Sequence, residues 1–227
     1  MLKLIIGNKT YSSWSLRGWL AAKQSGLPFE EVVVSLYDEA WEARKAQADL
    51  APSAGRVPTL WDGEAVLWDS LAIIDYLDAL SGRARFWPKE RPALALARAM
   101  AAEMHAGYMP LRQACGMNLR HVLPPAPLSG EVSADVARIL HLWRAARTRF
   151  GGGGPFLFGD FGAADIMFAP VVTRFVTYSV AVPADARAYM DAILAHPFMA
   201  EWIAAAKAEP WVIARLEPAG VGDQHQG

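Results

Sequence analysis

Apolar and polar positions follow one pattern up to about residue 81 and a different pattern beyond it. In residues 1–81, short apolar runs alternate with stretches of helical spacing. These segments predict strands and helices in the order βαβαββα, at 3–6, 15–24, 31–34, 41–50, 57–61, 64–68 and 69–80. The Asp-Gly pair at 62–63 is typical of a hairpin turn between the last two strands.

From residue 91 onward the pattern is almost entirely helical. Helices are predicted from 91 to about 119, after a cap at Ser133, and at about 162–178, 184–195 and 197–208. Residues 82–90 show neither pattern and predict a linker. The sequence therefore predicts the α+β class, with a βαβαββα domain at 1–81 and an all-helical domain at 91–227.

Composition excludes several classes of function. The chain has 227 residues, 53% of them hydrophobic, and a net charge of −1, so nothing favours disorder, nucleic acid or an anionic membrane as partner. One cysteine excludes an internal disulfide, and the five histidines lie too far apart in sequence to predict a metal site. The most apolar stretch, 163–182, contains Asp165 and Arg174, which favours a core helix over a membrane span. Because no apolar run near the start suits a signal peptide, we expect a cytoplasmic protein.

Four short motifs carry a likeness to a known family: Ser12-Ser13-Trp14-Ser15, Val57-Pro58-Thr59-Leu60, Asp69-Ser70 and the segment from Gly159-Asp160 to Ala164-Asp165. Together they resemble the cytosolic glutathione transferase family over nearly the whole chain, with motif spacing closest to the zeta class. The resemblance implies a thioredoxin-like domain followed by a helical bundle, glutathione as cosubstrate and a homodimer. Two positions depart from the pattern, because Gly162 replaces a Ser or Thr helix cap and Trp14 replaces the zeta-class cysteine.

By this resemblance, the serine loop at the start of the first helix activates the glutathione thiol. Ser12 and Ser13 are both candidates for the catalytic role. Alignment on the zeta loop favours Ser12, and counting back four residues from Arg17 favours Ser13. A hydroxyl that donates to sulfur at a helix N-terminus raises the thiolate fraction. Trp14 and Ser15 are implied glutathione contacts, and the alternative is that these serines only cap the helix.

Four further residues are implied to bind glutathione: Val57, Pro58, Asp69 and Ser70. In the family the proline is cis, and the residue before it offers its backbone to an extended peptide. Ser70 opens a helix whose free N–H groups attract a carboxylate, and Asp69 can meet the ligand's ammonium group. Without a ligand, Pro58 is an ordinary strand proline and Asp69 is only a helix cap.

A pocket for the second substrate is predicted beside the long helix that begins at residue 91. Tyr108, Met109 and Arg112 fall on roughly one face of that helix, although such spacing is also typical of core residues. Arg174 lies in the most apolar helix, where it either pairs with a core carboxylate such as Asp165 or reaches a carboxylate of the substrate.

Three functions are compatible with these residues. The first is a glutathione transferase that conjugates or reduces small electrophiles with a serine-stabilised thiolate, in detoxification. The second is a zeta-like cis–trans isomerase of the maleylacetoacetate isomerase type, acting on an unsaturated diacid. The third is a non-catalytic interaction module of the same fold, which the joint retention of Ser12, Val57-Pro58 and Asp69-Ser70 argues against.

Overall fold

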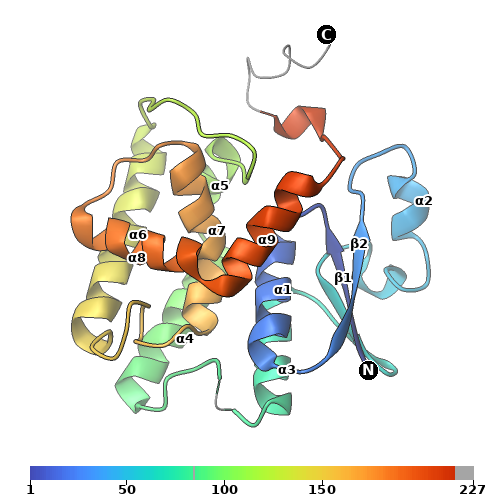
Figure 1. The fold of residues 1–227 in the computed structure, drawn as a ribbon, viewed down its shortest axis with the longest axis horizontal. Helices are drawn as coiled ribbons and strands as arrows, with labels where there is room; N and C mark the ends of the chain where they lie inside the picture. Colours follow the sequence, from blue (N-terminus) through green and yellow to red (C-terminus); the bar gives the residue numbers. More distant parts are fainter. Residues whose placement is uncertain (84, 218–227) are drawn as a thin grey trace.

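The computed structural model describes residues 1–83 and 85–217. Its N-terminal part (Figure 1) has the predicted element order: β1 (Leu2–Gly7), α1 (Ser13–Ser25), β2 (Phe29–Val34), α2 (Trp41–Lys45), β3 (Thr59–Asp62), β4 (Ala65–Leu67) and α3 (Ser70–Leu80). The four strands lie in the order β2-β1-β3-β4, with β1 parallel to β2 and antiparallel to β3.

The alternation of side chains along β1 assigns one cluster of apolar residues to each face of the sheet. Leu4 and Ile6 belong to the large core that α1 and α3 share. Ile5 points to the other face, where it packs with Trp41 of α2 and with Ile213 near the end of the described chain. The sheet therefore lies between α1 and α3 on one side and α2 on the other (Figure 1).

The rest of the described chain is helical: α4 (Arg91–Ala106), α5 (Met109–Ala114), α6 (Gly130–Phe150), α7 (Ala163–Thr177), α8 (Ala184–Ala195), α9 (Pro197–Ala208) and a short 3₁₀ turn, η2 (Ala214–Leu216). Helix α7 packs against α4 and α8 and also against α1, so it joins the helical part to the N-terminal part. This packing explains why almost every residue of α7 is buried.

Three predicted helix boundaries are wrong. The helix predicted at 41–50 ends at Lys45, because the Gln47 N–H donates to the Arg44 carbonyl only three residues back, and a 3₁₀ turn, η1 (Ala51–Ser53), follows. The helix from 91 does not reach 119, because it ends before Gly107 and Tyr108, where Tyr108 adopts a left-handed conformation with φ of 63°. Helix α6 begins at residue 130 rather than after Ser133, because the Ser129 hydroxyl accepts a hydrogen bond from the Val132 N–H.

The predicted α+β class is confirmed. At the start of α7, where Gly162 replaces a Ser or Thr cap, half of a capping box is retained. The Asp165 carboxylate accepts the Gly162 N–H at 3.0 Å, as half of a capping box requires. Its other oxygen accepts the Leu157 N–H and the Tyr189 hydroxyl, both at 3.1 Å. Both oxygens of Asp165 therefore accept hydrogen bonds from Gly162, Leu157 and Tyr189, and the pairing with Arg174 that the sequence left open is not formed.

Candidate functional site

A cavity of about 650 Å³ brings together many of the predicted site residues. Its walls come from the N-terminus of α1, from α2 and the segments on either side of it, from the turn into β3, from the turn into α3 and from the end of α4. The lining residues are Ser12, Trp14, Leu36, Tyr37, Trp41, Lys45, Ala54, Gly55, Arg56, Val57, Pro58, Trp68, Asp69 and His105. A second cavity of the same volume lies between residues 85–97 and 149–165, but it contains none of the predicted site residues.

Ser12 is the N-cap of α1 and lies in the cavity wall. Its hydroxyl accepts the Ser15 N–H at 3.2 Å and lies 2.8 Å from the Ser15 hydroxyl. Ser15 is fully buried and accepts the Gly7 N–H at 2.9 Å, which ties the cap to the end of β1. In this structure the Ser12 hydroxyl donates to Ser15. Because hydroxyl groups rotate, Ser15 can instead donate to Ser12, which leaves the Ser12 O–H able to point at a ligand.

Ser13 is directed away from the cavity. Its hydroxyl accepts a hydrogen bond at 3.2 Å from Nη2 of Arg174, and both side chains are buried. The two serines that the sequence left as alternatives therefore face different surroundings, with Ser12 against the cavity and Ser13 against a core guanidinium.

The Val57–Pro58 segment presents open backbone to the cavity. The peptide bond is cis, as the resemblance implied. Within residues 1–83 and 85–217, the N–H and carbonyl groups of Val57 form no hydrogen bond, because β3 begins only at Thr59. An extended peptide in the cavity can pair with both groups.

Asp69 caps α3 and also meets a residue of the helical part. One carboxylate oxygen accepts the Leu71 N–H at 3.1 Å, and the other lies 3.2 Å from Nε2 of His105. Ser70 is fully buried, and its hydroxyl has no partner among the described residues. Asp69 therefore lies in the cavity wall, whereas the Ser70 side chain lies behind it.

Trp14 is surrounded by cationic side chains. Its ring lies 4.9 Å from the guanidinium of Arg17 and 5.0 Å from that of Arg112, and His105 meets it edge-on at 5.4 Å. Burial, together with the charges of Arg112 and Arg174, lowers the pKa of Arg17. In the described part of the chain, Arg17, Arg112 and Arg174 form no ion pair with a carboxylate. These guanidinium groups instead donate hydrogen bonds to backbone carbonyls, such as that of Met167 for Arg17, and their positive charge has no carboxylate partner among the described residues.

None of the four residues predicted for a second-substrate pocket lines the cavity. Tyr108, Met109 and Arg112 were placed on one long helix, which is broken at Gly107, and Arg174 lies in α7. Tyr108 donates to Glu103 at 2.6 Å, and burial raises its pKa. Met109 is 52% exposed, and Arg112 donates to the Gly107 carbonyl at 2.8 Å. Arg174 donates to the Cys115 carbonyl, and burial lowers its pKa to about 10.

His105 is the main lining residue that sequence reasoning missed. It stands 36 positions after Asp69, on a different predicted domain, and a single histidine on an amphipathic helix is an unremarkable pattern. Trp41 and Lys45 lie in a segment to which the sequence motifs assign no role, yet both line the cavity. Only tertiary packing brings His105, Trp41 and Lys45 into the cavity wall.

Comparisons with known proteins show the family of the chain. Family models described as glutathione S-transferase N-terminal domain and C-terminal domain match residues 11–80 and 129–205, which together exceed half of the chain. The chain belongs to the glutathione S-transferase family. No curated protein sequence matches it. The predicted family is thus confirmed, whereas the narrower likeness to the zeta class stays a prediction.

Solved structures of this family share the fold at low sequence identity. A glutathione transferase homologue from Burkholderia gl BGR1 with bound glutathione is 24% identical, with a TM-score of 0.66 over 92% of this chain and 98% of its own. A holo maleyl pyruvate isomerase, described as a bacterial zeta-class glutathione S-transferase, is also 24% identical, with a TM-score of 0.68 over 93% and 100%. Glutathione transferase F2 from Populus trichocarpa is 14% identical, with a TM-score of 0.67 over 92% and 100%.

Two negative findings concern residues 1–83 and 85–217. No helix there is both long and apolar enough to cross a membrane. The histidine, cysteine and acidic side chains of the same residues form no group of three that could hold a metal ion.

Proposed function

We propose that this chain binds glutathione in the cavity beside α1 and uses its thiolate to conjugate or reduce small electrophiles. The observation that carries the proposal is that Ser12, the open backbone of Val57 and the carboxylate of Asp69 line one cavity. These are a hydroxyl at a helix N-terminus, a peptide-pairing edge and an acid at a second helix N-terminus. An extended tripeptide with a thiol at its centre needs these three groups.

The charges along the cavity suit the two ends of glutathione. At one end, the α3 N-terminus offers backbone N–H groups to the γ-glutamyl carboxylate, and Asp69 offers its own carboxylate to the ammonium group. At the other end, Lys45 and Arg56 are the cationic lining residues, and they suit the glycyl carboxylate. Between them, the Val57 backbone pairs with the cysteinyl amide.

Thiol activation is assigned to Ser12 rather than Ser13. Ser12 lies in the wall at the N-terminus of α1, where its O–H and the helix dipole both favour negative charge on sulfur. The thiol proton leaves to solvent. In conjugation the thiolate forms a bond to the electrophilic carbon while a leaving group such as chloride departs with its bonding electrons. In reduction of an organic peroxide the thiolate attacks oxygen, the O–O bond breaks and the alcohol leaves, and a second glutathione converts the oxidised sulfur to the disulfide with release of water. Ser13 accepts a hydrogen bond from Arg174, so we expect the Ser13 side chain to stabilise the fold rather than to contact the thiol.

His105 acts in this proposal as a positioning residue for Asp69. Its Nε2 lies 3.2 Å from the carboxylate oxygen that the helix cap leaves free. Its ring also rests edge-on against Trp14, so two cavity groups fix its orientation. The imidazole therefore holds the Asp69 carboxylate toward the position of the ligand's ammonium group.

The test compares Ser12→Ala with the neighbouring Ser13→Ala. Glutathione binding is measured by calorimetry, the bound thiolate by its ultraviolet absorbance as a function of pH, and turnover with a chlorodinitrobenzene-type electrophile or an organic peroxide. We expect Ser12→Ala to raise the pKa of the bound thiol toward the roughly 8.5 of a free cysteine thiol, while Ser13→Ala leaves it unchanged. If the wild type does not bind glutathione, the proposal fails and the non-catalytic module is favoured.

One observation favours an isomerase as the second candidate. Arg17, Arg112 and Arg174 lie together behind Trp14 without an acidic partner among the described residues, and an anionic substrate would supply the missing charge. A zeta-like isomerase adds glutathione reversibly to an unsaturated diacid. Turnover of a maleyl-type diacid that is abolished in Arg174→Ala supports this function, and absence of turnover excludes it.

The homodimer remains an expectation of the resemblance, which sedimentation of the full chain tests.

A further inference from the structure

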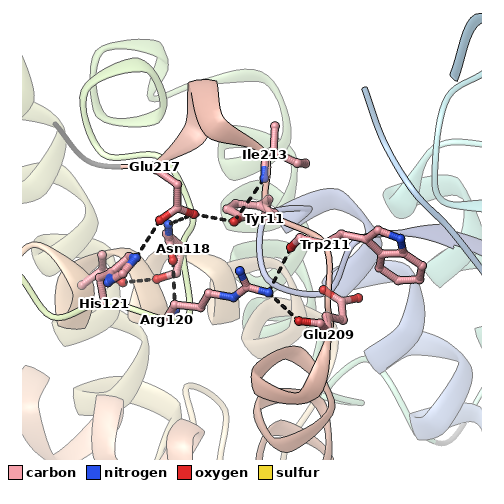
Figure 2. Close-up of polar contacts among 9 residues, drawn as sticks. Tyr11, Asn118, Arg120, His121, Glu209, Trp211, Ile213 and Glu217 are labelled. Atoms are coloured by element: carbon pink, nitrogen blue, oxygen red, sulfur yellow. Dashed lines mark hydrogen bonds and ion pairs between the residues drawn. The ribbon is translucent and has the colours of Figure 1, made fainter. Parts of the chain in front are cut away.

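The loop that carries Ser12 is held from outside by the last described residues of the chain. We call residues 209–217 the C-terminal clasp (Figure 2). At its beginning, the Glu209 carboxylate accepts the N–H groups of Lys9 and Thr10 at 2.6 and 3.0 Å. One carboxylate therefore satisfies two successive N–H groups of the loop between β1 and α1.

At the other end of the clasp, Glu217 binds the residue directly before Ser12. Its carboxylate accepts the Tyr11 hydroxyl and also meets Nδ2 of Asn118 at 3.2 Å and Nε2 of His121 at 2.7 Å (Figure 2). The Tyr11 hydroxyl in turn accepts the Ile213 N–H at 3.4 Å. Burial and the bond to Glu217 raise the pKa of Tyr11 to about 12, so its hydroxyl remains a donor at neutral pH.

Arg120, from the segment between α5 and α6, also binds the clasp. The Arg120 guanidinium donates to the carbonyls of Glu209 and Trp211 at 2.6 and 3.0 Å (Figure 2). Arg120 also lies over the Tyr11 ring at 5.9 Å. Segments near residues 11, 120 and 209–217, which are far apart in sequence, thus form one connected polar network.

The network reaches the candidate catalytic hydroxyl through a single turn of backbone. The N–H groups of Tyr11 and Ser12 both donate to the Asn8 carbonyl, at 3.3 and 2.9 Å. Tyr11 points outward to the clasp, while Ser12 lies in the cavity wall. The clasp also touches the wall itself, since Arg215 lies 3.7 Å from the ring centre of Tyr37.

From these contacts we infer that the C-terminal clasp positions the Ser12 hydroxyl, so that Glu217, acting through Tyr11, sets how much of the bound thiol is ionised. Glu217 and Tyr11 are positioning residues, because neither lines the cavity. The physical basis is that a hydrogen bond to sulfur weakens steeply with distance and angle, so a small displacement of the Ser12 turn lowers the thiolate fraction. The inference rests on the proposed function of Ser12.

The experiment uses the full chain with glutathione and reads the bound thiolate by ultraviolet absorbance against pH. The variants are Tyr11→Phe, which keeps the ring, Glu217→Ala, and Glu217→Gln, which keeps an acceptor for Tyr11. The matched control is Glu201→Gln, since Glu201 is an acid of α9 that pairs with Lys23 at 2.8 Å, away from the Ser12 loop.

We expect Tyr11→Phe and Glu217→Ala to lower the thiolate fraction at neutral pH by roughly three- to tenfold, because the bound thiol loses part of its stabilisation. Glu217→Gln should fall between Glu217→Ala and the wild type, and Glu201→Gln should match the wild type. In a double-mutant cycle, Tyr11→Phe should have no further effect once Ser12→Ala is present. That non-additivity separates positioning from general destabilisation.

Two kinds of failure remain distinct. If the wild type itself binds no glutathione or shows no thiolate, the proposed function fails. If the wild type shows the thiolate but Tyr11→Phe and Glu217→Ala titrate as it does, the inference is overturned while the proposed function stands. An equal effect of Tyr11→Phe with and without Ser12 also overturns it.

Discussion

Gly18 of α1 lies against Pro58, next to the Val57 backbone that we propose pairs with glutathione, so adding one methyl group at position 18 tests the proposed site. A Cβ at position 18 would lie 2.6 Å from Cβ and 2.7 Å from Cγ of Pro58. Both atoms belong to a ring that cannot rotate away. The substitution Gly18→Ala therefore forces α1 and the segment at 57–58 apart.

The expected size of the effect follows from two opposing contributions. Overpacking a close contact costs about 1–3 kcal/mol, whereas Ala favours a helix over Gly by about 1 kcal/mol. We expect the free energy of unfolding to fall by up to about 2 kcal/mol. Displacement of Val57 should also weaken its two backbone hydrogen bonds to glutathione, each worth about 0.5–1.5 kcal/mol, so affinity should fall roughly fivefold or more.

The assay is urea unfolding together with calorimetric titration of glutathione. The control is Gly130→Ala at the start of α6, where an added Cβ has no atom within 4 Å, so only the helix preference should act. We expect the control to be as stable as the wild type or more stable, with unchanged affinity. The reasoning is refuted if Gly18→Ala matches the control in both measurements.

Three further predictions concern single contacts. His105→Gln should weaken glutathione binding two- to tenfold, about 0.5–1.5 kcal/mol, because it loosens Asp69; unchanged affinity in calorimetry would contradict this role. Trp14→Leu removes two cation–π contacts and should lower the free energy of urea unfolding by roughly 1–3 kcal/mol, and a loss below about 0.5 kcal/mol would exclude them as stabilising. Burial raises the pKa of Glu217, but the hydrogen bond from Tyr11 and its other partners outweigh burial and hold that pKa below its ordinary value. The stability that Glu217 contributes is therefore full above about pH 4.3 and is lost as pH falls through its lowered pKa, so wild type and Glu217→Gln should converge in unfolding free energy at acid pH, and a constant gap would disprove it.

Much of the site could be predicted because its signals are local. Asp69 precedes an amphipathic helix and caps it, as short polar residues do at such positions. Ser12 stands in the same relation to α1. Val57 and Pro58 are adjacent in sequence, so their motif was visible without long-range contacts, although the strand predicted from residue 57 begins only at Thr59.

The rest depended on contacts between distant segments. Nothing local at Tyr108 indicates its left-handed backbone, since a bulky residue rarely adopts that conformation without tertiary support. The break beside it decides that Arg112 turns back to the Gly107 carbonyl. Arg174 donates to the Cys115 carbonyl and to Ser13, a choice that no spacing along α7 reveals.

By itself, then, the sequence determined the order of elements, the fold class and the family, because hydrophobic periodicity and helix caps act within a few residues. Only the tertiary structure decided that Ser12 faces the cavity and Ser13 the core, that His105 meets Asp69, and that Glu217 reaches Tyr11 from the far end of the chain. The physical reason is that each of these pairs depends on how distant elements pack: α1 against α7, α3 against α4, and the segment after α9 against the loop before α1. That packing is set by the whole apolar core rather than by any local pattern.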